Sequence, residues 1–460
     1  MYIIDQNSST ALHIQLYKAI KNEIIENLSV GEKLASIRKV ASTYNLSKNT
    51  VESAYRQLYA EGYVESYAKK GYFVSDTNYK SFAQEVDLNK IKQEEKPAYK
   101  YDFFPARLSK DTFPLKLYKR LYTKAIDESL DFGAYTDGQG QSGLRQEIAK
   151  YLMASRGVKC HSDQIVICNG FADSMGLLAK MVQKKYDSFA MENPGYYVAK
   201  TVFEDYGYKI EKIPVNDNGL DLDMLQASKS KIVYITPSHQ YPTGVSMPIS
   251  NRVKLLEWAN NVDGIIIEDD YDSELTYKNR PIPSLQGLDT NERVVYLGTF
   301  AKSLSPALRV SYMVLPNYLV KKFKTLYEAS FAKVSLMTQK TLEIFIKEGH
   351  YERHIRKMRT LNRKKHNLLK EELLKRLGSS IKIQAQGGGL AIAINPIGNL
   401  NLLKLETLAL EKGVKLYFAS RTSGGDWEAL RMGFGGFTLK EIPEAVKAFA
   451  EVYKEVIREK

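Results

Sequence analysis

Tyr296-Leu-Gly-Thr-Phe-Ala-Lys302-Ser-Leu-Ser-Pro-Ala-Leu-Arg309 is the stretch around which this chain is organised. The mostly apolar residues 293–297 predict a short buried strand, and the Gly-Thr pair that follows ends it just before a lone lysine. We therefore expect Lys302 at a strand end, where α/β sheets bind their ligands. Together, Thr299, Lys302 and Arg309 form a set that could hold an aldehyde and its phosphate.

Length and composition limit the classes of protein to consider. The 460 residues are too many for one ordinary domain and predict two or three. An apolar content of 44% and a charged content of 26% are typical of a soluble globular protein. No apolar stretch has the length of a membrane span, and the start, Met1-Tyr-Ile-Ile-Asp, lacks the basic and apolar regions of a signal peptide. We therefore expect a cytoplasmic protein that does not enter a membrane.

The net charge of +13 favours an anionic partner, but the charge is unevenly distributed. Residues 1–78 contain nine Lys/Arg and eight Asp/Glu, whereas residues 317–376 contain sixteen and six. Most of the excess therefore lies on one segment. A basic helical face is more often simply solvated, but in a chain that binds DNA it would also suit the phosphates that flank the recognised sequence.

The first module is predicted to be helical. Apolar residues recur at helical spacing in residues 12–20, 37–44 and 51–58, which predicts three short amphipathic helices. Ser36 opens the second helix and Ser47 opens the third, and serine is a favoured N-cap residue. These helices are sufficient for a small core of their own.

A basic hairpin is predicted to follow the third helix. Two strand-like runs, residues 63–65 and 72–74, flank the turn Ala68-Lys-Lys-Gly71. Three helices followed by a hairpin with a basic tip are the outline of a winged helix-turn-helix. The alternative is a helical module that contacts other proteins, with the same residues as ordinary surface polar groups.

Motifs along this module resemble the GntR-type DNA-binding domain. They include Gly31-Glu-Lys-Leu-Ala-Ser-Ile-Arg38, Leu46-Ser-Lys-Asn-Thr-Val51 and Lys70-Gly-Tyr-Phe-Val74. Two departures are visible, because Ala35 stands where the family usually has proline and Lys48 where it often has arginine.

The resemblance implies DNA contacts from the start of the recognition helix, which enters the major groove, and from the tip of the wing. The predicted DNA-binding residues are Arg38, Ser47, Lys48, Asn49, Thr50, Lys69, Lys70 and Gly71.

A polar segment separates two predicted domains. Residues 79–100 are rich in Lys, Glu and Gln and contain few apolar residues, so they cannot form a core alone. We interpret them as a partly helical or disordered linker. The winged helix-turn-helix then occupies residues 1–78, and a second domain occupies residues 101–460.

The second domain is predicted to have an α/β fold. Strand-like runs alternate with helical stretches from about residue 120 to residue 316, which predicts a mainly parallel sheet with helices on both faces. The basic helical stretch after residue 316 and the mixed tail from residue 381 predict a smaller α+β subdomain.

The lysine stretch and motifs before it resemble the fold-type I aminotransferases that bind pyridoxal phosphate (PLP). The similarity is closest to the MocR/GabR regulators, whose segment reads much like Gly-Thr-Phe-Ser-Lys-x-Leu-x-Pro-x-Leu-Arg. The resemblance implies that Lys302 forms the Schiff base with PLP and that Thr299 and Arg309 bind the phosphate. It also implies that an acid faces the ring nitrogen, and strand alternation favours Asp269, on the same face as Tyr271, for this role.

Five further residues follow from the same resemblance. Tyr196 matches the aromatic residue that stacks on the PLP ring, and the backbone N–H groups of Phe171 and Ala172 match the turn that cradles the phosphate. Tyr135 resembles the tyrosine that reaches the PLP phosphate of a neighbouring subunit, which implies a homodimer. Arg431 is the expected ligand of the carboxylate of an amine or amino-acid effector.

One motif departs from the family. In Thr236-Pro-Ser-His-Gln-Tyr-Pro-Thr-Gly244 the asparagine that binds the PLP phenolic oxygen is replaced by Tyr241, and His239 and Gln240 are the candidate substitutes. This departure argues against efficient transamination. His350 and His354 have a spacing that can bind metal, but no cluster of acids or cysteines accompanies them. We expect a solvated pair and no metal site.

The two modules together resemble the MocR/GabR regulators. The resemblance implies a PLP-dependent transcription regulator that binds a double-stranded DNA operator as a dimer and senses an amine or amino acid. An incoming amine would take the place of Lys302 on PLP while Arg431 holds its carboxylate. Two alternatives stay open: a catalytically active class I/II aminotransferase, and a sensor of PLP itself.

Overall fold

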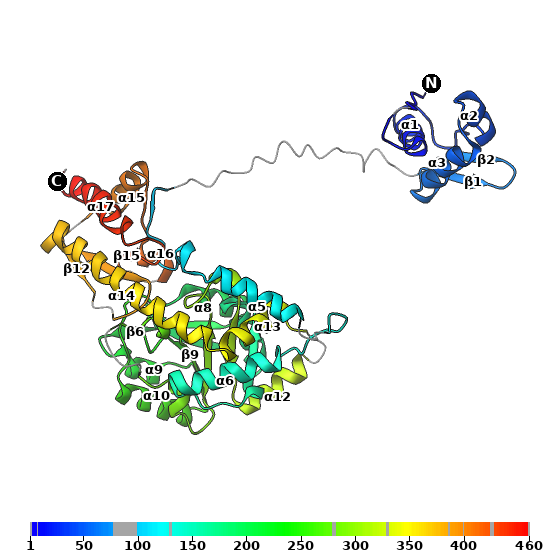
Figure 1. Ribbon diagram of the computed structural model, residues 1–460. Coiled ribbons are helices and arrows are strands. Elements are labelled where there is room, and N and C mark those ends of the chain that lie inside the picture. The colour runs from blue at the N-terminus through cyan, green and yellow to red at the C-terminus, as the bar shows by residue number, and fades with distance from the viewer. Residues whose placement is uncertain are drawn as a thin grey trace. The chain divides into compact units, whose positions relative to one another are not determined.

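The computed structural model describes residues 2–6, 8–76, 99–127, 131–277, 282–327, 331–384, 387–398, 400–423 and 427–458. The chain divides into two units, Met1–Lys96 and Pro97–Lys460 (Figure 1). The linker predicted for residues 79–100 lies outside the described residues, apart from its last two positions.

The first unit is a small helical core with a hairpin. Its elements are α1 (Leu12–Glu26), α2 (Ile37–Thr43), α3 (Lys48–Ala60), β1 (Val64–Tyr67) and β2 (Gly71–Val74). The predicted caps are confirmed, because the Ser36 hydroxyl accepts a hydrogen bond from Lys39 N at 3.2 Å and the Ser47 hydroxyl accepts one from Thr50 N at 3.0 Å. The unit therefore has the winged helix-turn-helix form expected from its sequence.

A single apolar cluster holds this unit together. Leu16, Ile20, Val51 and Leu58 have no solvent exposure and pack where α1 and α3 meet. The strands pair antiparallel, and the turn between them contains Lys69 with φ of 61°. The helices bury their apolar faces, so the polar residues at the start of α3 and at the wing tip remain outside.

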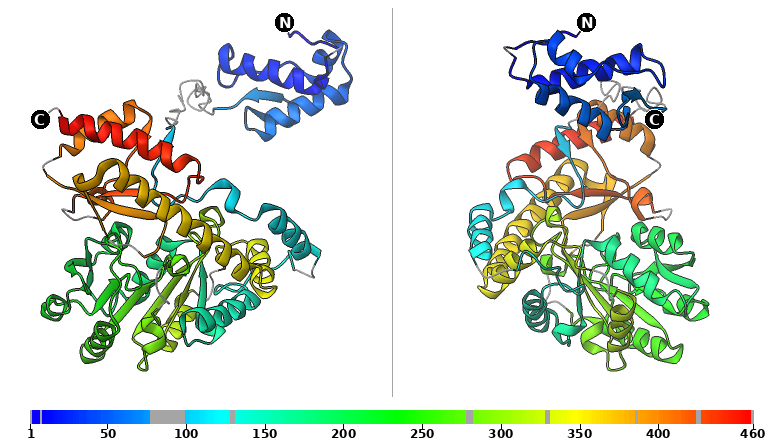
Figure 2. Two further views of the ribbon diagram at one scale, coloured as in Figure 1. Left: turned by 60° about the vertical axis from the view of Figure 1, so that its left-hand side comes forward. Right: turned by 90° about the vertical axis from the view of Figure 1, so that its right-hand side faces the viewer.

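The second unit is built on a mixed sheet, which in the described residues has eight strands in the order β4-β11-β10-β9-β8-β5-β6-β7 (Figure 2). The strands are β4 (Ile165–Cys168), β5 (Ser188–Asn193), β6 (Lys209–Asn216), β7 (Gly219–Leu220), β8 (Ile232–Ile235), β9 (Ile265–Asp269), β10 (Val294–Thr299) and β11 (Ser311–Val314). Strands β6, β5, β8, β9 and β10 run parallel. Strand β11 is antiparallel to β10 and β4, and β7 is antiparallel to β6.

Helices cover both faces of this sheet, because successive residues of its buried strands point to opposite sides. Ile267 and Val295 pack with α7, α8 and α12, whereas Ile266 packs with α9, α10 and α11, and Tyr296 with α5, α6 and α13. The helices are α5 (Leu115–Asp127), α6 (Ser142–Arg156), α7 (Phe171–Val182), α8 (Tyr197–Asp205), α9 (Leu222–Ala227), α10 (Ile249–Asn261), α11 (Leu285–Leu288), α12 (Asn317–Leu326) and α13 (Leu336–Lys347). The sheet and these helices are called the large lobe.

A small lobe follows in the chain. It contains β3 (Tyr101–Asp102), β12 (Ile381–Ile383), β13 (Ala391–Pro396), β14 (Val414–Lys415), β15 (Leu430–Gly433), α15 (Leu402–Glu411), α16 (Ala419–Ser423) and α17 (Glu441–Arg458). Strands β12, β13 and β15 form an antiparallel sheet, and β3 pairs with β14. The long helix α14 (His350–Leu377) joins the lobes, because Tyr351 packs in the large lobe and Leu373 in the small one.

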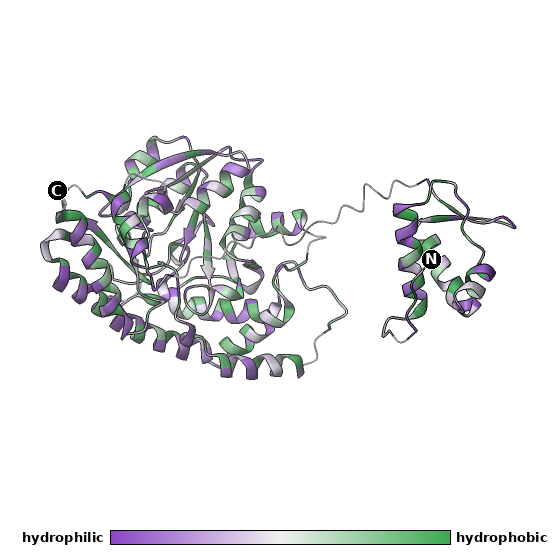
Figure 3. Cartoon of the chain, turned by 90° about the horizontal axis from the view of Figure 1, so that it is seen from above, coloured by the Kyte–Doolittle hydropathy of each residue, from purple (hydrophilic) through white to green (hydrophobic). Residues whose placement is uncertain are grey.

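The predicted fold class is therefore confirmed: a winged helix-turn-helix precedes an α/β domain of the fold-type I transferase form with a small α+β subdomain. Figure 3 shows apolar and polar residues on opposite sides of many helices, as expected for helices that cover a core. In the part of the chain that the structure describes, no helix has the length and hydrophobicity to cross a bilayer.

Candidate functional site

A pocket of about 690 Å³ lies where the carboxyl ends of β5, β8, β9 and β10 meet the small lobe. Parallel strands place their ends at one edge of a sheet, so residues far apart in the sequence gather there. The predicted cofactor and effector residues that line the pocket are Phe171, Tyr196, Asp269, Tyr271, Thr299, Lys302, Arg309 and Arg431.

One end of the pocket has two features that attract an anion. Helix α7 begins at Phe171, where the first-turn N–H groups have no partner in the helix. Gly170 caps the helix with φ of 84°, and a Cβ at this position would lie 2.2 Å from the Arg309 guanidinium. Arg309 also donates to Asn169 O at 3.4 Å. A helix N-terminus and a guanidinium thus converge, and both attract an anion such as a phosphate.

Lys302 lies just beyond β10, and its amine faces the pocket without a hydrogen bond to any described residue. Burial and, to a smaller extent, the positive charge of Arg431 lower the pKa of Lys302 to about 8, against the opposing effect of Asp272 and Asp269. A larger share of this amine is therefore neutral near physiological pH than for an ordinary lysine. The neutral amine is the form that attacks an aldehyde.

Asp269 supplies a buried carboxylate at the end of β9. Its Oδ2 accepts a hydrogen bond from the Tyr234 hydroxyl at 2.6 Å. Burial raises the pKa of Asp269 to about 7. A cationic ring nitrogen placed beside this group would favour its charged form. Tyr234 was missed by the sequence analysis, although an aromatic residue inside the aliphatic strand Ile232–Ile235 is a weak signal for it.

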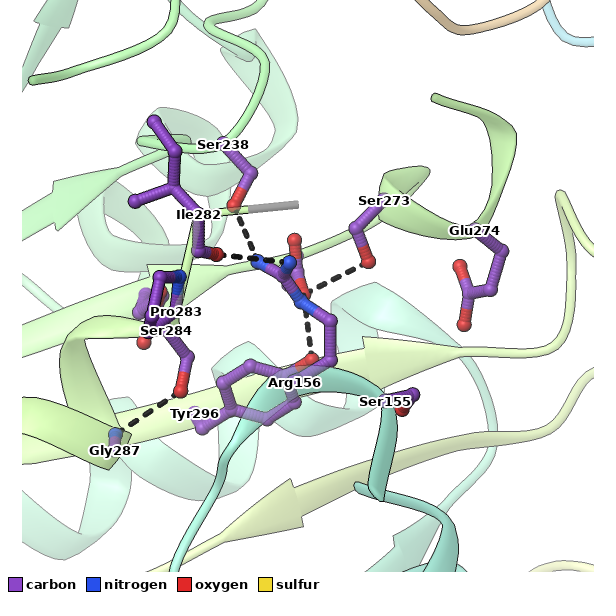
Figure 4. Close-up of polar contacts among 12 residues, drawn as sticks. Ser155, Arg156, Ser238, Ser273, Glu274, Ile282, Pro283, Ser284, Gly287 and Tyr296 are labelled. Atoms are coloured by element: carbon purple, nitrogen blue, oxygen red, sulfur yellow. Dashed lines mark hydrogen bonds and ion pairs between the residues drawn. The ribbon is translucent and has the colours of Figure 1, made fainter. Parts of the chain in front are cut away.

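Asp270 points away from the pocket into a separate network. Its Oδ2 accepts hydrogen bonds from Arg156 at 2.6 Å, Tyr296 at 2.7 Å and Ser273 at 2.9 Å. Burial opposes ionisation, but Arg156 and these hydrogen bonds outweigh it and hold the pKa of Asp270 below its ordinary value. Arg156 also donates to Ser238 at 2.7 Å (Figure 4). The network therefore holds Asp270, which follows Asp269, and Ser238, which precedes His239.

The turn that departs from the family pattern is ordered by its own side chains. Gln240 donates to Pro194 O at 2.8 Å and to Tyr241 O at 2.6 Å, so it braces the turn and is not in the pocket lining. His239 lines the pocket with Nδ1 2.8 Å from Asp272, and its Nε2 has no partner among the described residues. Of the two candidate substitutes for the missing asparagine, only His239 therefore faces the site.

Tyr241, which stands in place of the family's asparagine, packs against Arg431. The Arg431 guanidinium lies over the Tyr241 ring at 4.3 Å from its centroid. The same ring meets Tyr196 edge to face, with 5.2 Å between centroids. Arg431 therefore approaches the pocket stacked on an aromatic ring, which leaves its hydrogen-bond donors available for a carboxylate.

A second buried acid supports this wall of the pocket. The Glu192 Oε2 accepts hydrogen bonds from Thr236 N at 3.1 Å and from its hydroxyl at 2.7 Å, which ties the end of β5 to the end of β8. Burial raises the pKa of Glu192 to about 7. The end of the pocket at the start of α7 likewise contains Ser174 and Ser311, whose hydroxyls lie 3.0 Å apart. The sequence analysis singled out none of these residues, and only Thr236 stands in a motif that it quoted.

Two predicted cofactor residues are outside the pocket. Tyr135 is 80% exposed and stacks on Phe331 with 4.1 Å between ring centroids. The Ala172 side chain lines a different pocket, together with residues of α7 and α8 and with Tyr327, so only its backbone N–H remains a candidate phosphate ligand.

The expectation that His350 and His354 form a solvated pair was wrong. His354 is buried, and its Nε2 lies 3.0 Å from Ser303 O. His350 is half-buried and lies beside Glu348 and Arg353. The packing of α14 against the large lobe buries His354 and partly covers His350. Within the described ranges, no group of three His, Cys, Asp or Glu residues is arranged to hold a metal ion.

The predicted DNA-binding residues lie on the surface of the first unit. Arg38, Ser47, Lys48, Asn49, Lys69 and Lys70 are exposed, and Thr50 and Gly71 are partly buried. The Ser47 hydroxyl also lies 2.7 Å from the Thr50 hydroxyl, so both groups are engaged at the start of α3. Lys48 and Asn49 therefore project from the start of the helix with fewer constraints.

Comparison with known proteins agrees with both units. The model for aminotransferase class I and II matches residues 108–449, and the model for bacterial regulatory proteins of the gntR family matches residues 12–74. The uncharacterized HTH-type transcriptional regulator YdeL of Bacillus subtilis is 35% identical over 96% of this chain and 97% of its own length. The probable rhizopine catabolism regulatory protein MocR of Rhizobium meliloti is 29% identical over 98% and 96%. The chain belongs to the MocR-type transcription regulators.

The second unit of this MocR-type regulator has the fold of an aminotransferase. The multiple substrate aminotransferase of Thermococcus profundus superposes with a TM-score of 0.71 at 24% identity, and the match covers 84% of this chain and all of that one. A GntR-type DNA-binding module is thus joined to an aminotransferase-like domain, as the sequence analysis predicted.

Proposed function

We propose that this regulator binds PLP through Lys302 and responds to an amine that carries a carboxylate. The observation that supports the proposal is one pocket that combines a lysine of lowered pKa with an anion site on one side and Arg431 on another. The fit is specific, since Gly170 leaves room for Arg309 at the start of α7, where the helix N-terminus and the guanidinium both attract an anion.

When bound, PLP supplies an aldehyde that condenses with amines and a ring that withdraws electrons. Lys302 contributes the amine that holds the aldehyde, and Thr299, Arg309 and the start of α7 hold the phosphate. Asp269 keeps a proton on the ring nitrogen, and the hydroxyl of Tyr234 holds that carboxylate in place. Tyr196 covers one face of the ring from the start of α8.

The effector that this pocket fits has an amine and a carboxylate. Arg431 binds the carboxylate, and stacking on Tyr241 orients its guanidinium. An effector amine that replaces Lys302 releases a lysine whose lowered pKa lets it accept or donate a proton near neutral pH. Because Arg431 belongs to β15 of the small lobe, a ligand that bridges Arg431 and the large lobe favours closure of the two lobes.

We further propose that two copies of the chain form the working unit. Apolar side chains are exposed on α5, on the segment after it and at residue 331, namely Leu115, Ile126, Phe132, Tyr135 and Phe331. An exposed apolar patch of this kind is typical of a protein interface. Tyr135 would then reach the phosphate site of the partner. With DNA as its partner, we place the regulator in the cytoplasm.

The lysine assignment is tested by absorbance. Protein mixed with PLP is expected to show a visible band that borohydride reduction removes and that K302A lacks. Lys180 is an exposed lysine on α7 outside the pocket, so K180A should keep the band. A reducible band that persists in K302A would overturn the proposal.

The effector and dimer parts have separate tests. Candidate amino acids should change the spectrum of the wild-type protein, and R431Q should raise the concentration that is needed. Y135A should weaken PLP binding although Tyr135 does not line its own pocket, whereas Y318A, which removes an exposed tyrosine of α12 outside the pocket and the proposed interface, should not. Unchanged PLP affinity in Y135A would contradict the shared site.

A true aminotransferase is the second candidate, because the pocket contains Lys302 with the pKa of a usable base. Tyr241 in the place of the family's asparagine weighs against it, since no amide faces the pocket at that position. Sustained multiple turnover with an amino acid and a keto acid would favour the enzyme. A response of DNA binding to PLP alone, without an amine, would favour a sensor of PLP.

A further inference from the structure

The positive charge of this regulator lies outside its DNA-binding module. Residues 1–78 have a charge balance of only +1, from nine Lys/Arg and eight Asp/Glu. Helix α14, by contrast, has ten Lys/Arg and three Glu within 28 residues. DNA affinity depends strongly on the number of phosphates that basic residues neutralise. The winged helix-turn-helix alone therefore has little excess positive charge with which to neutralise phosphates.

The charges of α14 gather on one side of the helix. The inward side packs against both lobes through Tyr351, Ile355, Leu369 and Leu373. The exposed basic residues recur at helical spacing on the opposite side and are Arg353, Arg356, Lys357, Arg363, Lys364 and Lys375. At about 1.5 Å per residue this outward face extends for roughly 33 Å. Figure 1 shows α14 along the outside of the second unit.

Several of these charges have no acidic partner. Arg356 lies 3.8 Å from Glu352, and Arg353 contacts His350 and Glu348 O. In contrast, Lys357, Arg363 and Lys364 form no ion pair within 4.0 Å with any residue that the structure describes. Like charges at neighbouring helical positions repel one another, which opposes helix formation. The fold therefore does not explain their concentration on one face.

We propose that the outward face of α14 is a second DNA-contact surface, which binds phosphates outside the sequence that the winged helix-turn-helix reads. Charge complementarity identifies the partner, because the six exposed lysine and arginine side chains of this face outnumber its exposed acids, Glu352 and Glu371. The roughly 33 Å of the face matches about one turn of duplex. DNA bound by the first unit is also tethered to the second, which raises its local concentration there. The proposal rests on DNA binding by the regulator, and it adds a surface that the family matches do not assign.

The proposal has a quantitative signature in salt dependence. Each phosphate contact contributes about 0.9 to the slope of log affinity against log salt concentration. Loss of three contacts should lower that slope by roughly 2 to 3. A purely structural role for these side chains would not change the slope.

The test compares full-length wild type with the triple variant K357Q/R363Q/K364Q. Fluorescence anisotropy is measured with mixed-sequence duplexes of about 20 and about 60 bp, between about 50 and 200 mM NaCl. The matched control, K229Q/K231Q/K254Q, removes three exposed lysines near α9, β8 and α10. We expect the α14 variant to lower the slope on the longer duplex by roughly 2 to 3 and to change the shorter one less, while the control lowers neither.

Two outcomes overturn the proposal. Equal slopes for wild type and the α14 variant on the longer duplex would exclude DNA as the occupant of this face. If the α14 variant and the control lowered the slope equally, the effect would come from the net charge of the protein and not from this face. Failure of DNA binding as such is distinguishable, because wild type would then bind neither duplex. Failure of the cofactor proposal is also distinguishable, because it is measured by absorbance without DNA.

Discussion

The reactivity of Lys302 is predicted to depend on pH in a way that an ordinary lysine does not. Burial and the charge of Arg431 lower its pKa to about 8. At pH 7 roughly one amine in ten is then neutral, against roughly one in 3,000 for a lysine with a pKa near 10.5. Since only the neutral amine attacks an aldehyde, the structure predicts a reactive fraction of Lys302 that is roughly 300-fold larger than for an exposed lysine at this pH.

The assay is stopped-flow absorbance of PLP-free protein mixed with PLP at a series of pH values. The rate should rise with pH, because the lysine loses its proton, and should level off above about 8. In R431Q the inflection should move to higher pH, since a positive charge near the amine is removed. Arg107 lines the same pocket but is paired with Asp102 at 2.9 Å, so R107Q serves as the control.

Two results would refute this reasoning. A wild-type rate that still rises steeply at pH 10 would mean that Lys302 keeps the pKa of an exposed amine. An inflection that moves equally in R431Q and R107Q would mean that Arg431 has no special effect on the amine.

Three further outcomes are expected. R156M should destabilise the protein by about 3 to 5 kcal/mol in urea unfolding, because Asp270 loses its partner in a buried site. G170A should weaken PLP binding, since the added Cβ meets Arg309 at 2.2 Å and φ is 84°. The pKa of Asp269 is raised by burial to about 7, so stability without cofactor should fall as pH rises from about 4 to 7, at up to about 1.4 kcal/mol per pH unit, and D269N should remove this loss.

Each of these expectations has a contradicting result. A midpoint in R156M equal to that of wild type would mean that the ion pair is dispensable, and the double variant R156M/D270N should recover part of the loss. Unaltered PLP affinity in G170A would argue against a phosphate at the start of α7. Parallel stability curves for D269N and wild type between pH 5 and 8 would show that Asp269 titrates as an ordinary carboxylate.

The sequence predicted those parts of the site that are encoded locally. Lys302 and the strand before it, and the turn before Phe171, follow from short runs of neighbouring residues. The same holds for Ser36 and Ser47, because a cap bonds to the backbone only three residues away. Such features need no knowledge of the tertiary fold.

The missed features depend on contacts across the fold. Tyr234 reaches Asp269 over 35 residues of sequence, and Arg156 reaches Asp270 over 114. His354 was expected in solvent because its spacing to His350 reads as a surface pattern, but its partner Ser303 is 51 residues away. The burial of one side of a long helix is decided by its neighbours in space. Site residues that local patterns do not identify, such as Tyr196 and Arg431, were predicted from the resemblance to a family.

The single guanidinium of Arg156 has a consequence for genetics. It ties the last residue of α6 to the strand end of β9 and to the turn that holds Ser238, without touching any ligand itself. A screen for mutants that no longer respond to the proposed effector should therefore recover position 156 alongside position 302. Such a mutant would mimic a lesion in the binding residues while leaving every one of them unchanged.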